Sequence, residues 1–127
     1  MAVAATGLLL CNAVYEDPSS HNVTLLGIFT ELYSTKFPTP YRNISVYALL
    51  TGEVGEFTEL TLACVSEMTQ ATVLSVSQRV QIGRNGKRQV HIRSGAMSFP
   101  EPGEYRFSLA SDGEVVAVQK VLVLERT

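Results

Sequence analysis

The feature of this sequence that most constrains its fold is an alternation of apolar and polar residues with a period of two. Between residues 72 and 82 the apolar side chains include Leu74 and Val76, and the polar ones between them include Ser75 and Ser77. The segment 104–109 alternates in the same way. Because successive side chains of a strand point to opposite faces, this pattern predicts half-buried strands. No segment shows the periodicity and caps of an amphipathic helix, so the sequence predicts an all-β protein.

Turn-forming residues separate the alternating segments by roughly eight to twelve residues, which is typical of β-sandwiches and barrels. The clearest breaks are the loop that opens at Asp17-Pro18, the extended crossing segment at Phe37–Pro40, and the turns at Asn85-Gly86 and Asp112-Gly113. Asn-Gly and Asp-Gly tolerate positive φ at both positions and therefore predict type I′ hairpin turns. We expect strands at 7–15, 23–33, 43–51, 57–66, 72–83, 87–94, 104–111 and 114–124.

Length and composition limit the organisation of the chain. Its 127 residues, 46% of them hydrophobic, suffice for one domain over 1–127 and leave no room for a second. The net charge of −2 excludes a globally basic nucleic-acid binder, but a local basic patch is still possible.

The N-terminal segment and the cysteines indicate the compartment. The apolar residues before Cys11 are too few to span a bilayer, and they lack the basic residues of a signal peptide. We therefore expect a first strand there and a cytoplasmic protein. Cys11 and Cys64 have no CxxC spacing, which is typical of buried, reduced residues, although the sequence leaves their pairing open.

A specific structural motif lies between Pro100 and Phe107. Tyr105 follows the corner residues Pro102 and Gly103, and this arrangement resembles the tyrosine corner of immunoglobulin-like sandwiches. In that motif the phenol hydroxyl bonds to the main chain upstream, so we assign these three residues a structural role. Phe107 stands where an antibody domain has its second cysteine, and the chain has no Trp. The sequence thus predicts an immunoglobulin-like β-sandwich of seven to nine mostly antiparallel strands, without the antibody disulfide.

Several phrases together resemble a small bacterial all-β domain family of unknown function. They are Leu9-Leu10-Cys11, Leu25–Phe29, Phe37-Pro38, Phe99–Phe107 and Asp112–Ala117, and they occur in order over nearly the whole chain. The resemblance implies a single all-β domain of a bacterial cell. It transfers no catalytic or binding residue.

Charge is distributed unevenly along the chain. The segment 79–93 contains five basic residues and no acidic one, whereas acids predominate elsewhere. We expect a basic hairpin here, with a cationic tip and further basic groups on its solvent face. Its candidate binding residues are Arg84, Lys87, Arg88, His91 and Arg93. The patch would suit an acidic partner, an identical subunit or a phosphate, or it would only protect an exposed edge.

The terminal strands are apolar on both parities, at 8–10 and at 115–124. Such strands are buried on both faces or are covered by another chain. A homo-oligomer or a partner contact through these strands is one interpretation, and a closed core is the other.

The sequence contains few residues that could form a catalytic site. A hydrolase would have to use His21 or His91 as its base, and a triad can be written only from turn residues such as Asp17 and Ser19. No metal-ligand spacing or phosphate loop is present, so we expect no metal, no cofactor and no enzyme activity. We interpret the protein as a non-catalytic protein-binding or assembly module of a bacterial cell, whose partner is another protein or a second copy of itself. The alternatives are an anion or nucleic-acid contact through 79–93 and, least favoured, a small hydrolase.

Overall fold

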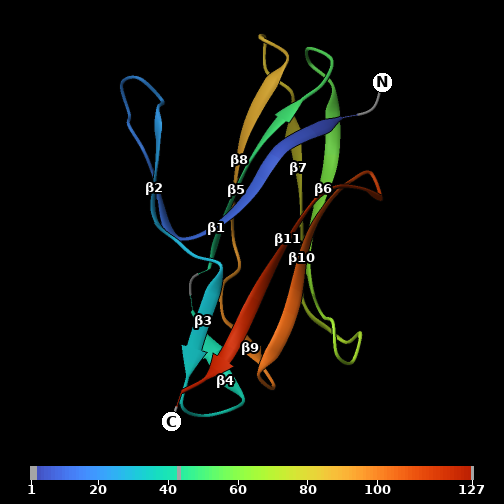
Figure 1. Ribbon diagram of the computed structural model, residues 1–127. Coiled ribbons are helices and arrows are strands. Elements are labelled where there is room, and N and C mark those ends of the chain that lie inside the picture. The colour runs from blue at the N-terminus through green and yellow to red at the C-terminus, as the bar shows by residue number, and fades with distance from the viewer. Residues whose placement is uncertain (1–2, 43, 127) are drawn as a thin grey trace.

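The computed structural model describes residues 3–42 and 44–126, and these form an all-β sandwich (Figure 1). The described strands are β1 (Ala4–Glu16), β2 (Val23–Ile28), β3 (Glu31–Ser34), β4 (Thr39–Tyr41), β5 (Ser45–Thr51), β6 (Phe57–Ser66), β7 (Thr72–Gln81), β8 (Lys87–Arg93), β9 (Met97–Phe99), β10 (Gly103–Ser111) and β11 (Glu114–Glu125). In this part of the chain there is no helix of the length and apolarity needed to cross a membrane.

Two sheets face each other in the sandwich. One has the strand order β2-β1-β5-β8, and the other has the order β3-β11-β10-β6-β7. The strand pairs of these sheets are antiparallel except β3 with β11, and β4 and β9 form a separate small ladder. The set β6, β10 and β11 takes the places of strands C, F and G of an immunoglobulin domain, while β5 and β8 take those of B and E. The predicted immunoglobulin-like sandwich is confirmed.

The described residues form eleven strands rather than the seven to nine expected. The expected strand 23–33 divides near Phe29-Thr30, because β2 pairs with β1 in one sheet and β3 with β11 in the other. The short strands β4 and β9 had no alternating signal, since each is only three residues long.

The core is built from alternate residues of the two sheets, as the period-two pattern requires. Leu10 and Leu50 from one sheet and Leu62 and Phe107 from the other are at most 1% exposed. Cys64 lies in the same cluster, and burial raises the pKa of its thiol to about 12. Both cysteines are buried and free, so they serve as small apolar side chains.

The corner before β10 is held by Tyr105. Its side chain is fully buried, and its hydroxyl donates a hydrogen bond to the carbonyl oxygen of Glu101 at 2.6 Å. The same hydroxyl accepts a hydrogen bond from the backbone N–H of Glu101 at 3.3 Å. Phe99 packs edge-on against the phenol ring, with 4.8 Å between ring centroids. This is the bonding pattern of a tyrosine corner, and Gly103, at φ 143°, takes a backbone conformation that favours glycine.

The segment 79–93 is not a hairpin, which corrects one sequence prediction. β7 pairs with β6 and β8 pairs with β5, so the two strands belong to opposite sheets. A tight turn joins them, in which the N–H of Gly86 donates to the carbonyl oxygen of Gly83 at 3.0 Å. Gly86 has positive φ but Asn85 does not, so the turn is not type I′. By contrast Asp112 and Gly113 both have positive φ, as predicted for the β10–β11 turn.

A hairpin arm, residues 12–28, extends from the sandwich (Figure 1). β1 pairs with β5 as far as Cys11 and from there on with β2, so its second half leaves the packed sheet. Gly27 permits this arrangement: its φ is +67°, and a Cβ on it would lie 2.3 Å from the side-chain nitrogen of Asn12. The arm positions the site described below.

We predict that Tyr105→Phe destabilises the protein by about 1–2 kcal/mol, because the backbone of Glu101 loses both of its hydrogen bonds to the phenol hydroxyl. Urea unfolding of the variant and the wild type measures this difference. Tyr33→Phe is the matched control, since the Tyr33 hydroxyl bonds only the exposed Glu31 carboxylate, and its cost should stay within about 0.5 kcal/mol. Equal costs for the two variants would contradict the role of the corner.

Candidate functional site

The hairpin arm folds over the outer face of the four-stranded sheet. Val14, Glu16 and Val23 of the arm face Tyr47, Gln89 and His91 of β5 and β8 around a small cavity of about 60 Å³. At the tip of the arm, the side-chain amide of Gln89 donates a long hydrogen bond, 3.5 Å, to the carbonyl oxygen of His21. These contacts hold the arm against the sheet and form one wall of a larger groove.

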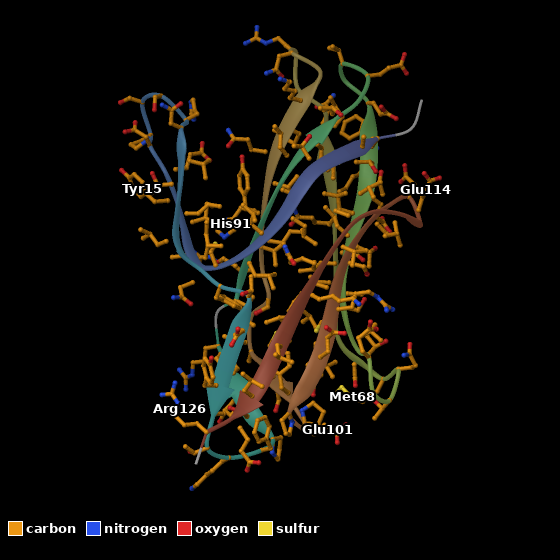
Figure 2. The ribbon with its side chains drawn as sticks, viewed as in Figure 1. Tyr15, Met68, His91, Glu101, Glu114 and Arg126 are labelled. Atoms are coloured by element: carbon orange, nitrogen blue, oxygen red, sulfur yellow. The ribbon has the colours of Figure 1, made fainter. Side chains whose placement is uncertain are left out.

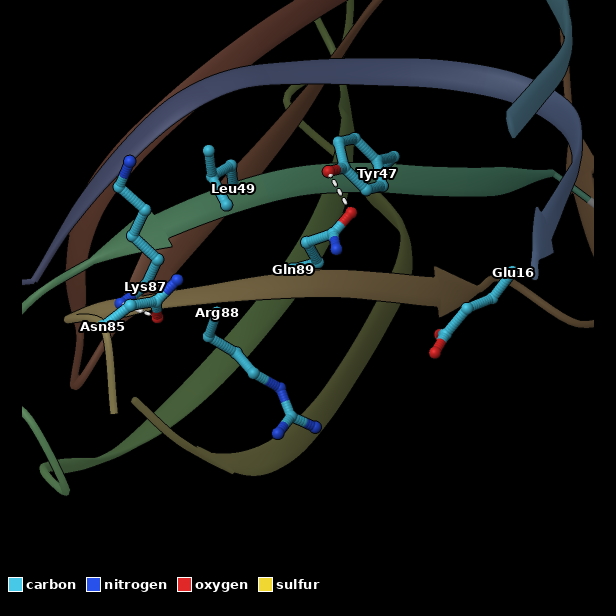
Figure 3. Close-up of a pocket in the computed structure, with 7 residues that line it drawn as sticks. All are labelled: Glu16, Tyr47, Leu49, Asn85, Lys87, Arg88 and Gln89. Atoms are coloured by element: carbon cyan, nitrogen blue, oxygen red, sulfur yellow. Dashed lines mark hydrogen bonds between the residues drawn. The ribbon is translucent and has the colours of Figure 1, made fainter. Parts of the chain in front are cut away.

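The groove beside the arm has a volume of about 590 Å³ (Figure 3). Its lining residues are Glu16, Tyr47, Leu49, Asn85, Lys87, Arg88 and Gln89. Lys87 and Gln89 leave β8 on the side of Tyr47, whereas Arg88 leaves it on the opposite side. The Tyr47 hydroxyl donates to the side-chain oxygen of Gln89 at 2.7 Å, and this bond fixes both side chains on the floor of the groove.

The cations of the groove have no acidic partners in the described structure. No described carboxylate lies within ion-pair distance of Lys87, Arg88, Arg84 or Arg93. The outer face of the five-stranded sheet differs, since Glu67 pairs there with both Arg106 and Lys120. The groove therefore carries positive charge that the described residues do not neutralise.

The structure places the five candidate binding residues that the sequence suggested at different locations. Lys87 and Arg88 line the groove, and His91 lines the small cavity under the arm. Arg84 lies in the turn between the sheets but not among the lining residues, and Arg93 lies at the far end of β8, opposite Ser45. The fifth base of the segment, Arg79, is on the other sheet and stacks on the ring of Phe57 at 4.3 Å.

Five lining residues were missed by the sequence analysis: Glu16, Tyr47, Leu49, Asn85 and Gln89. They come from the arm, from β5, from the turn before β8 and from β8 itself. No local pattern in the sequence indicates that the arm folds back over β8, because that contact joins residues 68 positions apart.

His91 has an unusual environment beneath the arm (Figure 2). Its Nε2 atom is buried and has no hydrogen-bond partner among the described residues. Burial lowers the pKa of this imidazole, and the nearby charge of Arg93 lowers it further. The structure therefore favours neutral His91.

The loop at the tip of the arm contains the other residues considered for catalysis. The Asp17 carboxylate accepts hydrogen bonds from the backbone N–H groups of Ser19 and Ser20, at 2.8 and 3.1 Å. The bond from Ser20 and then that from Ser19 lower the pKa of Asp17. Nδ1 of His21 lies 2.9 Å from Glu16. In this loop the imidazole therefore faces a glutamate, not the aspartate of the hydrolase alternative.

Metal-binding side chains are dispersed in the described structure. Within residues 3–42 and 44–126, no three Cys, His, Asp or Glu side chains gather closely enough to hold a metal ion.

Comparisons with solved structures agree with this architecture. An alkylpurine DNA glycosylase from Pseudomonas fluorescens, AlkC, solved bound to DNA containing an abasic-site analogue, matches 96% of the chain at TM-score 0.59 and 10% identity. A GH3 β-glucosidase from Bifidobacterium adolescentis matches 96% at TM-score 0.58 and 11% identity. The chain spans only 30% of the first protein and 17% of the second, and at these identities the likeness shows the fold alone.

The remaining comparisons concern nearly the whole chain. An immunoglobulin-like protein from Pseudomonas aeruginosa matches over 97% of both chains, at TM-score 0.48 and 16% identity. No curated protein matches the sequence. Residues 6–124 match the family of unknown function DUF6941, which confirms the family resemblance of the sequence. The chain, an immunoglobulin-like β-sandwich, therefore belongs to this family of unknown function.

Proposed function

We propose that the protein is a non-catalytic protein-binding module whose groove accepts an extended acidic segment of a partner protein. The observation that carries the proposal is the pair of cations, Lys87 and Arg88, which line a groove and have no described acidic partner. A volume of about 590 Å³ is within the usual range of ligand-binding pockets.

The remaining lining groups suit a peptide. The amides of Asn85 and Gln89 carry both donors and acceptors, which is what an extended backbone requires. Leu49 supplies apolar contact between the charged ends. Opposite charges across an interface steer association and select partners, so an acidic segment is favoured over a basic one.

A nucleic acid fits the same groove less well. Glu16 lines it and would repel a phosphate backbone, and Arg79 of the basic segment is occupied on the other sheet. Nucleic-acid binders usually neutralise several phosphates, and single-strand binders stack bases on aromatic platforms. Lys87 and Arg88 together with Tyr47 make a small set by comparison, so a protein segment is the better candidate.

The compartment follows as part of the proposal. Two buried free thiols fit a reducing environment such as the cytoplasm.

A titration tests the acidic-segment proposal. The probe is a hexapeptide of alternating Glu and Val, added to isotope-labelled full-length protein and followed by NMR shift changes. We expect the shifts to concentrate at Tyr47, Lys87, Arg88 and Gln89. The double variant Lys87→Glu, Arg88→Glu should weaken binding by at least about tenfold, because two attractive charges become repulsive.

Arg93→Glu is the matched control, since it reverses a charge on the same strand outside the groove and should leave the affinity within about twofold. A hexapeptide of alternating Lys and Val should not bind. Equal affinity of both peptides, or an unchanged affinity of the double variant, would refute the proposal. Binding of a short oligothymidine at the same residues, without peptide binding, would favour the nucleic-acid alternative instead.

The stability of the fold around the groove should also depend on pH, because the arm covers His91, which is neutral in the folded protein. The pKa of His91 is lowered in the folded protein, so the unfolded chain takes up its proton first as the pH falls through about 6.5. The free energy of unfolding should therefore decrease below that pH. We predict that His91→Gln reduces this decrease, as measured by urea unfolding between about pH 7.5 and 5.5. The same pH dependence in variant and wild type would contradict it.

A further inference from the structure

The outer edge of the hairpin arm is an open strand edge. β2 is the terminal strand of its sheet and pairs only with β1. In an antiparallel ladder, every second residue directs its N–H and C=O away from the paired strand. On β2 these groups face no strand of the described chain, so they form a template for another strand.

β2 differs from the other three terminal strands of the two large sheets. β8 carries Lys87, Arg88 and Arg93, β7 carries Arg79, and β3 carries Glu31. Charged residues on an edge strand oppose pairing with another chain. β2, Val23–Ile28, contains no charged residue and no proline. It is therefore the one terminal strand of these sheets without this protection.

The outer side of the arm is apolar as well. Tyr15 and Leu26 lie on the side away from the sheet, because their neighbours Val14 and Leu25 are on the inner side and partly buried. Tyr15, Leu26 and Ile28 are 54%, 53% and 56% exposed. Figure 2 shows Tyr15 on the far side of the arm from His91. An uncharged edge thus adjoins an exposed apolar face.

From these observations we propose that two copies of the chain associate through β2, which pairs antiparallel with β2 of the second copy. A second copy fits because a two-fold axis makes the same uncharged edge face itself, with no like charges brought together. The pairing joins the two four-stranded sheets into one and covers the open edge of both copies, so the assembly closes at a dimer. The arm lies at one side of the sandwich, which leaves room for the second molecule (Figure 1).

The dimer is independent of the acidic-segment groove. The groove uses the inner side of the arm and β8, whereas the dimer uses the outer edge of β2. A strand of six residues is about 20 Å long, so the contact is small and we expect a dissociation constant in the micromolar range.

Sedimentation velocity of the full chain, from about 1 to about 200 µM, tests the proposal. We expect a monomer–dimer equilibrium that persists at about 0.5 M salt, where exposed charge contacts are screened. Leu26→Lys should weaken dimerisation by at least about tenfold, because the symmetric contact then brings two like charges together. Val118→Lys is the matched control, since Val118 on β11 is 49% exposed, and it should dimerise like the wild type.

Hydrogen exchange locates the contact without any substitution. Amides of residues 23–28 should gain protection at high protein concentration, and those of 114–120 should not. A wild-type protein that stays monomeric over the whole range overturns the proposal. Protection confined to β11, or self-association that disappears at high salt, also overturns it and assigns the contact to the terminal strand or to the charged groove.

Discussion

The division of β1 between two partners is the constraint on which the rest of the structure depends. As far as Cys11 the strand lies in the sandwich beside β5, and beyond it the strand pairs with β2 alone. The inner side of the resulting arm covers His91 and forms a wall of the groove, and its outer edge is β2. If β1 stayed beside β5 along its whole length, the sheet would have neither the groove nor the unprotected edge.

The two outer faces of the sandwich differ in how their charges are balanced. On the five-stranded sheet, Glu67 pairs with Arg106 and Lys120, so these charges of the outer face are balanced. On the four-stranded sheet, Lys87 and Arg88 have no such partner in the described structure. A rigid core with one unneutralised groove is the organisation of a module that presents surfaces to other molecules, and this is why we favour binding over catalysis as the function.

Local sequence patterns predicted strands and turns well, but they did not predict which strands pair with each other. The strand 57–66 has the expected bounds, and Asp112-Gly113 forms the expected turn, because both depend on short-range sterics and alternation. Asn85-Gly86 has similar turn chemistry, yet the strands beside it enter different sheets. A turn sequence fixes the direction of the backbone over a few residues, but it does not fix which neighbour completes the ladder of hydrogen bonds. The basic segment was therefore mistaken for one hairpin.

The sequence by itself determined that the chain forms strands, which residues face the core, and that Tyr105 holds the corner at the start of β10, because these features follow from alternation and from neighbouring residues. Only the tertiary structure decided that the arm folds over β8, that Lys87 and Arg88 share a groove with Glu16, and that β2 is left as an edge. These contacts join distant parts of the chain, and their stability comes from burying surfaces that no single segment possesses.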